Sequence, residues 1–161
     1  FVTRRQHLYK LEDRWIRSDV ALFDEYVNRG FEETSAKLSN EWLKLAMQHV
    51  GGEFCSDMVR EWNRGIKDTY TERILKVLER LAQNYVRLQQ FDKVIRWAEK
   101  LIALDRGHEE GYRLLILANY YLGNRREAIK QYERCVNALE EQFQIQPMES
   151  TEAVYELVLK M

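Results

Sequence analysis

The sequence repeats itself at a fixed interval. Aligned without gaps, residues 88–95 match 122–129, and residues 99–102 match 133–136. Each unit holds two stretches of helical apolar spacing joined by a short turn. One such pair cannot bury its apolar stripe alone, so we expect successive pairs to stack and share one continuous core. This repeat constrains the fold more than any other feature of the chain.

A period of about 34 residues in a helix–turn–helix pattern is typical of the tetratricopeptide repeat, TPR. Ala128 and Tyr132 match the small and aromatic positions of its second helix, whereas the earlier unit has Val94 and Ala98 there. The units therefore resemble TPR repeats with departures. They predict an all-α fold of TPR-like antiparallel helix pairs, an α-α superhelix.

Helical apolar spacing extends over the whole chain from residue 18. The 161 residues include one proline and seven glycines, too few breakers for a turn-rich all-β protein. No apolar run approaches the length of a membrane span, and no signal-peptide pattern opens the chain. The predicted helices cover about residues 20–29, 32–49, 57–88, 91–104, 109–122, 125–143 and 151–160.

Residues 1–17 differ from the rest in both pattern and charge. They are short β-leaning pieces with five basic and two acidic side chains, and they predict a fragment of a β-hairpin. Residues 18–161 hold 20 basic and 24 acidic side chains, which argues against nucleic-acid binding by this main body. Cys55 and Cys135 stand far apart without a secretion signal, so we expect reduced thiols in a cytoplasmic protein.

No arrangement of residues predicts catalysis or cofactor binding. His7, His49 and His108 are widely separated, and no Cys or His stands at metal-ligand spacing from another. Phosphate-binding loops, dinucleotide fingerprints and nucleophile elbows are missing from the sequence. We therefore expect a protein that is not an enzyme, with no catalytic residues, no metal and no cofactor.

The first helix of each TPR pair lines the concave face of the array, so its outward positions are candidates for binding a protein. In the second unit these positions include Arg113, Leu117, Tyr120 and Tyr121. Arg and Tyr are enriched where protein–protein contacts carry most of their energy. The alternative is that the last helix, residues 151–160, folds over this face and fills it.

Two stretches of the sequence resemble a known family. Residues 122–134 are close to the repeat of the bacterial transcriptional activator domain of the antibiotic regulatory protein (SARP) type, and residues 139–152 resemble its closing motif. Gly52-Glu53-Phe54 resembles the loop before its long helix. Gln144 departs from the glycine that the family often has. The resemblance covers roughly residues 19–160.

The resemblance implies an interpretation of the N-terminal residues. In this family an OmpR-like winged-helix DNA-binding domain precedes the activator domain and ends in a wing hairpin. Residues 1–17 would then be the remnant of that wing, with Arg4 and Arg5 near its tip as contacts to the DNA backbone, and residues 18–161 the TPR-like activator domain. The helix that reads DNA would lie upstream of this sequence.

The resulting hypothesis is the regulatory, protein-interaction domain of a bacterial transcriptional activator. It would act by contact with RNA polymerase, with a second protomer in a homodimer or with a sensor domain, and it would meet DNA only through the upstream domain and not meet a membrane. The alternative is a free-standing TPR-like adaptor that binds a partner protein and has no DNA role. About 90 residues of upstream sequence with a winged-helix pattern would separate the two.

Overall fold

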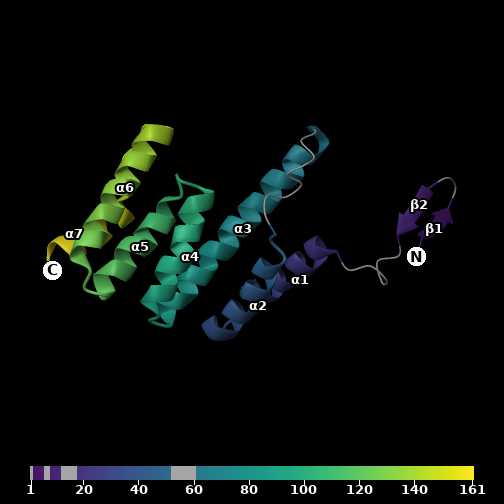
Figure 1. The fold of residues 1–161 in the computed structure, drawn as a ribbon, viewed down its shortest axis with the longest axis horizontal. Helices are drawn as coiled ribbons and strands as arrows, with labels where there is room; N and C mark the ends of the chain where they lie inside the picture. The colour runs from purple at the N-terminus through teal and green to yellow at the C-terminus, as the bar shows by residue number, and fades with distance from the viewer. Residues whose placement is uncertain (1, 6–7, 12–17, 52–60) are drawn as a thin grey trace. The chain divides into compact units, whose positions relative to one another are not determined.

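The computed structural model is organised in two compact units, residues 1–58 and 59–161. The structure describes the backbone of residues 2–5, 8–11, 18–51 and 61–161, and the side chains of residues 18–51 and 64–161. The first unit contains β1 (Val2–Arg5), β2 (Leu8–Leu11), α1 (Asp19–Glu32) and α2 (Ala36–Gln48) (Figure 1). The second contains α3 (Glu61–Arg87), α4 (Phe91–Leu104), α5 (Glu109–Tyr121), α6 (Arg125–Phe143) and α7 (Glu149–Leu159).

The two strands form a short antiparallel sheet in the segment where the sequence predicts a hairpin. Val2 pairs with Leu11 at one end of the ladder, and Arg5 pairs with Leu8 at the other. All other described elements are helices, so the prediction of an all-α chain from about residue 19 onward is confirmed for the described residues. The Gly52-Glu53-Phe54 loop and the predicted start of the third helix near residue 57 lie outside them.

Helices α1 and α2 form a helical hairpin in the first unit. Each begins at a serine, Ser18 and Ser35, whose side chain accepts a hydrogen bond from a backbone amide of the first turn. The prediction that the first helix ends at Gly30 is wrong, because this glycine lies buried inside α1. A Cβ atom there would lie 2.5 Å from the Leu43 side chain, so glycine is what lets α2 approach α1. Ser39 fastens the contact by donating a hydrogen bond to the Gly30 carbonyl.

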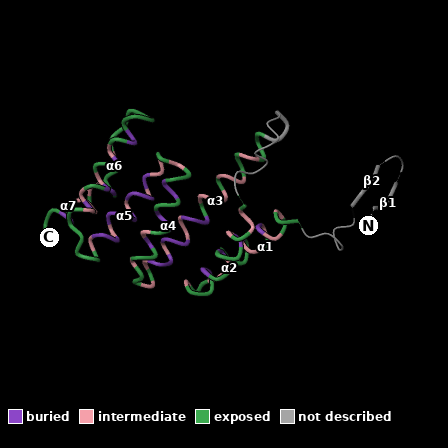
Figure 2. The backbone as a smooth tube through the Cα atoms, in the orientation of Figure 1, coloured by how far each residue is buried: buried purple, intermediate pink, exposed green. Residues whose placement is uncertain are grey.

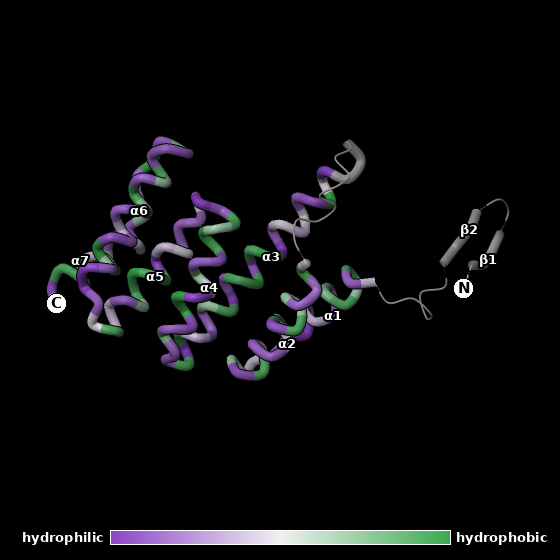
Figure 3. Tube along the Cα trace, viewed as in Figure 1, coloured by the Kyte–Doolittle hydropathy of each residue, from purple (hydrophilic) through white to green (hydrophobic). Residues whose placement is uncertain are grey.

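Helices α3 to α6 form the two predicted antiparallel pairs, with α5 packed against α4. Buried positions recur along these helices where they lie against one another (Figure 2). Hydrophobic and hydrophilic residues alternate along them in the colouring of Figure 3, as expected for helices that bury one stripe. The helices that the sequence predicts for residues 91–104 and 125–143 have these bounds in the structure.

The turns inside the two pairs have the same geometry at the same repeat position. Gln89 in the first pair and Gly123 in the second both adopt positive φ, at 54° and 75°. Their amides donate hydrogen bonds to the carbonyls of Val86 and Tyr120, which also occupy equivalent repeat positions. The repeat identified in the sequence is therefore repeated in the backbone, even where glutamine replaces glycine.

The core of the second unit lies between the stacked pairs. Gly111 of α5 faces α4 so closely that a Cβ atom there would lie 2.6 Å from the Ile102 side chain. Leu101 and Leu115 are fully or almost fully buried at this contact layer. The hydrophobic core is therefore continuous through both pairs, as the repeat predicts for stacked helix pairs. The largest fully buried side chains of the unit include Val77, Leu81, Val94, Leu101, Leu115, Ile116, Cys135, Leu139 and Val158.

Candidate protein-binding site

The four predicted binding residues lie on α5, but their surroundings differ. Arg113, Leu117 and Tyr120 are half-buried, whereas Tyr121 is 57% exposed. Arg113 and Tyr120 both take part in contacts with α7, described below, and Tyr121 takes part in none of those contacts. The structure therefore divides the predicted surface into a part that supports α7 and an open part at the end of α5.

A chain of polar contacts links α3 to α5 across the face formed by the first helices of the two pairs. Gln83 of α3 donates from Nε2 to Glu79 Oε1 at 2.9 Å and to Glu110 Oε1 of α5 at 3.3 Å. His108 Nε2 lies 3.6 Å from Glu79 Oε2. Most polar atoms of these half-buried groups are paired with one another, whereas Nδ1 of His108 is buried without a hydrogen-bond partner.

The polar chain ends at the start of α7. Arg113 forms an ion pair with Glu110 and donates a hydrogen bond of 2.6 Å to Ser150 Oγ. Neither Ser150 nor Thr151 occupies the cap position of α7, although both types of side chain often cap helices, and the residue at that position, Met148, makes no capping bond with its side chain. Ser150 is instead a partner of α5, which ties the first turn of α7 to the predicted binding face.

Glu109 supplies the missing cap from another helix. Its side chain is almost completely buried, and Oε1 accepts hydrogen bonds from the Met148 backbone amide at 2.7 Å and from Thr151 Oγ1 at 2.6 Å. A carboxylate at a helix N-terminus accepts hydrogen bonds from the free amides and interacts favourably with the positive end of the helix dipole. Glu109 therefore fixes where α7 begins, a role that sequence reasoning missed because the partners are far apart in the chain.

The rest of α7 is held by apolar and aromatic contacts. Val158 is fully buried with Ile116 of α5 and Ala128 of α6, and Tyr120 packs against this cluster. Four further side chains complete the contact: Ile129, Tyr132, Val154 and Tyr155. Helix α7 thus covers the end of the second pair, so the alternative that the last helix fills the predicted face is correct for part of that face.

An aromatic pair lies beside the covered region. The rings of Tyr132 and Tyr155 are stacked with centroids 3.7 Å apart, and the Tyr132 hydroxyl donates to Glu152 Oε1 at 2.6 Å. Burial raises the pKa of Tyr132, and the hydrogen bond to Glu152 raises it further, so the tyrosine stays protonated in this contact. The pair joins α6 to α7 and therefore helps to hold the two helices together.

Tyr121 forms the open part of the site together with a residue that the sequence pattern did not single out. Its ring is stacked on Phe91 of α4, with centroids 4.6 Å apart and planes 10° apart, and it meets Tyr120 edge to face at 5.3 Å. Phe91 was missed because it belongs to the second helix of a pair, and only the stacking of the pairs brings it beside Tyr121. An exposed aromatic step of this kind suits an apolar side chain of a partner.

The other predicted site residues, Arg4 and Arg5, lie in β1, where they pair with Tyr9 and Leu8. Their side chains are outside the part of the chain that the structure describes, so a DNA contact stays a prediction.

The described residues hold no group of three or more His, Cys, Asp or Glu side chains that could bind a metal ion. Within the same residues, no helix is both long and apolar enough to cross a bilayer. Cys135 is fully buried, and this burial raises its pKa to about 12, so its thiol is not a ready nucleophile. Cys55 lies outside the residues that the structure describes.

Comparison with known proteins gives the chain a family and a fold. Residues 18–159 match the model of the bacterial transcriptional activator domain. The structure is similar to that of Mycobacterium tuberculosis EmbR in complex with a low affinity phosphopeptide, at a TM-score of 0.83 and 18% identity. This likeness covers 99% of the present chain and 43% of the EmbR chain, so the present chain spans less than half of that relative.

A second solved structure shares the fold. The C-terminal TPR-containing domain of a Plasmodium falciparum FK506-binding protein aligns at a TM-score of 0.66 and 18% identity, over 91% of the present chain and 93% of that domain. No curated protein matches the chain at a significant level. At these identities, the two structures establish the TPR-like fold and nothing about shared partners.

Proposed function

The chain belongs to the bacterial transcriptional activator domain family, and from this premise we propose that it is the regulatory, protein-contacting part of a bacterial transcription activator. The observation that carries the proposal is the family match over residues 18–159, almost all of the helical chain. The SARP type of regulator fits the motifs at residues 122–134 and 139–152.

Protein contact is the mode of action that the helical body supports best. Stacked helix pairs present extended surfaces to partners, and the second unit carries an exposed aromatic step at Tyr121 and Phe91. The solved EmbR structure, of which 43% of the chain aligns with the present one, is a complex with a phosphopeptide. RNA polymerase, a second protomer and an attached sensor domain are the partners we propose, in a cytoplasmic regulator.

DNA contact would come from a winged-helix domain upstream of this sequence. The helical body has more acidic than basic residues, whereas residues 1–17 have an excess of basic ones. In this proposal β1 and β2 are the end of the wing, and Arg4 and Arg5 touch phosphates. Replacing both arginines with alanine in the full-length regulator should weaken operator binding and flatten its salt dependence by about one or two units of slope.

The test of protein contact uses the full-length regulator with Leu117→Ala and Tyr121→Ala combined. These positions avoid Arg113 and Tyr120, whose loss would loosen α7. Operator binding should persist while transcription activation falls at least severalfold. Phe143→Ala is the matched control, because it removes an equally exposed aromatic side chain from the far end of α6. Full activation by a folded double variant would show that partners bind elsewhere.

A free-standing adaptor is the second candidate function. Its support is the likeness to a TPR-containing domain that aligns over nearly the full length of both chains. The gene sequence decides between the two candidates. A strand, three helices and a hairpin encoded upstream favour the activator, and the absence of that pattern favours the adaptor.

A further inference from the structure

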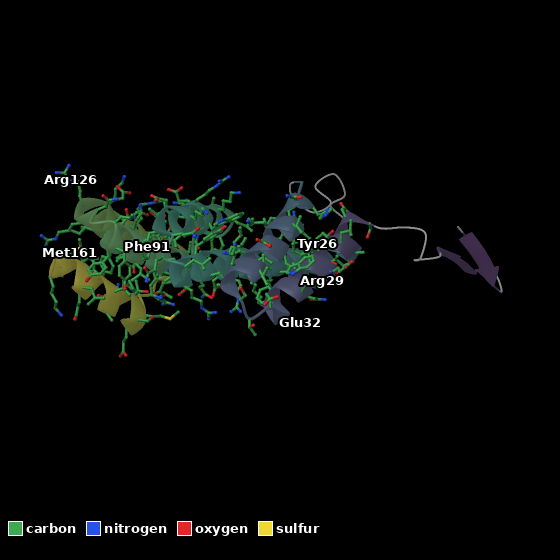
Figure 4. The ribbon with its side chains drawn as sticks, turned by 90° about the horizontal axis from the view of Figure 1, so that it is seen from below. Tyr26, Arg29, Glu32, Phe91, Arg126 and Met161 are labelled. Atoms are coloured by element: carbon green, nitrogen blue, oxygen red, sulfur yellow. The ribbon has the colours of Figure 1, made fainter. Side chains whose placement is uncertain are left out.

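One edge of the second unit combines exposed apolar side chains with an excess of cations. This edge, called the turn edge here, consists of the α3–α4 turn, the α5–α6 turn and the C-terminal end of α7, which lie along the lower side of Figure 1. Two contacts join its parts: the Phe91–Tyr121 stack, and a hydrogen bond of 3.1 Å from Arg125 Nη2 to the Leu159 carbonyl. Figure 4 looks at the molecule from below and labels Phe91 and Arg126 on this side.

The turn edge exposes several apolar side chains to solvent. Tyr121 is 57% exposed, Leu122 38% and Leu159 49%, and Phe91 supports the Tyr121 ring from below. Neighbouring apolar groups from three helices favour an interaction site over chance exposure of single side chains. An aromatic or aliphatic side chain of a partner could rest against the Tyr121 ring.

The charged part of the turn edge is mainly basic. Arg87, Lys93, Arg125 and Arg126 are exposed, and among the described residues no carboxylate forms an ion pair with any of them. Three acidic residues belong to the same edge, of which Glu156 lies 3.7 Å from Lys160 at the end of α7. Asp92 is exposed, and Glu127 lies 3.7 Å from Lys130 and so is already partly neutralised.

The position of two of these cations is unfavourable for the helix that carries them. Arg125 and Arg126 are the first two residues of α6, where the positive end of the helix dipole repels cations. By contrast, α1, α5 and α7 begin with Asp19, Glu109 and Glu149. The arginines therefore do not serve the stability of α6. Arg125 bonds to the Leu159 carbonyl at the end of α7, and the position of Arg126 favours a role toward a partner.

The opposite edge of the same unit has the opposite charge. The α4–α5 turn and the loop from α6 to α7 carry Asp105, Glu140, Glu141 and Glu149, with Arg106 lying 4.0 Å from Glu141. The two edges lie on opposite sides of the unit, so contact between them joins copies head to tail and leaves a free turn edge on one end copy and a free acidic edge on the other. Such contact produces open chains, so a different protein suits the turn edge better than a second copy.

We infer that the turn edge of the second unit is a docking site for an acidic segment of another protein, which places an aromatic or aliphatic side chain beside the Phe91–Tyr121 pair. The inference rests on the proposed function and names the chemistry of its partner. Charge complementarity carries it: cations without ion-pair partners flank the exposed aromatic step, and acidic side chains would be attracted to them while an apolar one is buried.

The test measures binding of the present chain to fluorescein-labelled synthetic peptides. One peptide alternates aspartate and glutamate around a central phenylalanine and leucine, and its control has asparagine and glutamine in place of the acids. The acidic peptide should bind at least about tenfold more tightly, and this preference should weaken as salt is raised. Equal binding of the two peptides, or binding of neither, overturns the inference.

Charge reversal locates the site. Arg125→Glu with Arg126→Glu should reduce affinity for the acidic peptide by about tenfold or more. This variant loses the exposed bond from Arg125 to Leu159 but should remain folded, because glutamates at the start of a helix favour it, and circular dichroism checks this. Glu140→Lys with Glu141→Lys on the opposite edge is the matched control and should not weaken binding. Unchanged affinity in the arginine variant, or self-association of the parent chain that both variants abolish, overturns the inference.

Failure of the docking site and failure of the proposed function give different results. If Leu117→Ala with Tyr121→Ala abolishes activation while the arginine variant keeps both peptide binding and activation, the turn edge is not the docking site but the proposed function stands. If neither variant affects activation although peptide binding is lost in the arginine variant, the docking site is real and the proposed function fails.

Discussion

The two helix pairs of the second unit share their construction but differ in what covers them. Val94 of the first pair and Ala128 of the second occupy equivalent repeat positions, and both are fully buried. The first pair is covered by α5, the next helix of the repeat. The second pair is covered by α7, which follows an irregular loop and is fastened by Glu109. The comparison shows that stacking is a property of the repeat, whereas ending the stack needs separate contacts.

The largest expected difference between the two pairs is in the stability that is lost when an equivalent buried side chain is truncated to alanine. Leu101 and Cys135 are equivalent, and both are fully buried. Leu101→Ala should lower the free energy of unfolding by about 2–5 kcal/mol, because it leaves a cavity against α5. Cys135→Ala removes a single sulfur atom and should cost about 1 kcal/mol. Urea denaturation measures both, and equal losses would contradict the packing described here.

Helix α7, which covers the second pair, should depend on its polar contacts with Glu109 more than the repeat helices depend on any one polar side chain. Glu109→Ala leaves the Met148 amide and the Thr151 hydroxyl without their acceptor, so we expect a loss of about 1–3 kcal/mol. Amide hydrogen exchange should quicken in α7 while α4 keeps its protection. Glu99→Ala, at an exposed position of α4, is the control. Equal quickening in α4 and α7 would mean that α7 is not a separate cover.

The two turns allow a smaller, reciprocal test. Gly123→Gln should destabilise the chain by about 1 kcal/mol, because a side chain is disfavoured at positive φ. A Cβ atom at Gly123 would meet nothing within 4 Å, so the effect comes from the backbone alone. Gln89→Gly should stabilise the chain by a smaller amount, since glycine also adds freedom to the unfolded chain. Thermal unfolding of the two variants would refute the equivalence if both shift in the same direction.

The smallest expected effect concerns the thiol that replaces leucine in the second pair. Burial raises the pKa of Cys135 to about 12, so the folded chain keeps the proton at pH values where the unfolded chain loses it. The free energy of unfolding should therefore fall with rising pH, by somewhat under about 1 kcal/mol between pH 7.5 and 9. Cys135→Ala should remove the contribution of the thiol to this decrease in the free energy of unfolding. The prediction would be contradicted if the parent chain and the variant had the same pH dependence of stability.

Much of the helical fold could be predicted from the sequence because the features that set it are local. The apolar spacing determined the bounds of α4 and α6, and the offset of the repeat identified the equivalent turns. Gly30 shows the limit of this reasoning. A glycine often ends a helix, but here it lies inside α1 because Leu43 of another helix needs the space.

The candidate site depended on contacts that no local pattern contains. The sequence placed Arg113, Leu117, Tyr120 and Tyr121 on one helix face, since helical spacing alone determines that. Only the tertiary structure decided that α7 engages Arg113 and Tyr120, and that Phe91 from another pair supports Tyr121. The physical reason is that hydrogen bonding within a helix and apolar periodicity act over a few residues. The capping of α7 by Glu109 and the stacking of aromatic rings join residues that are far apart in the chain and meet only once the helices have packed.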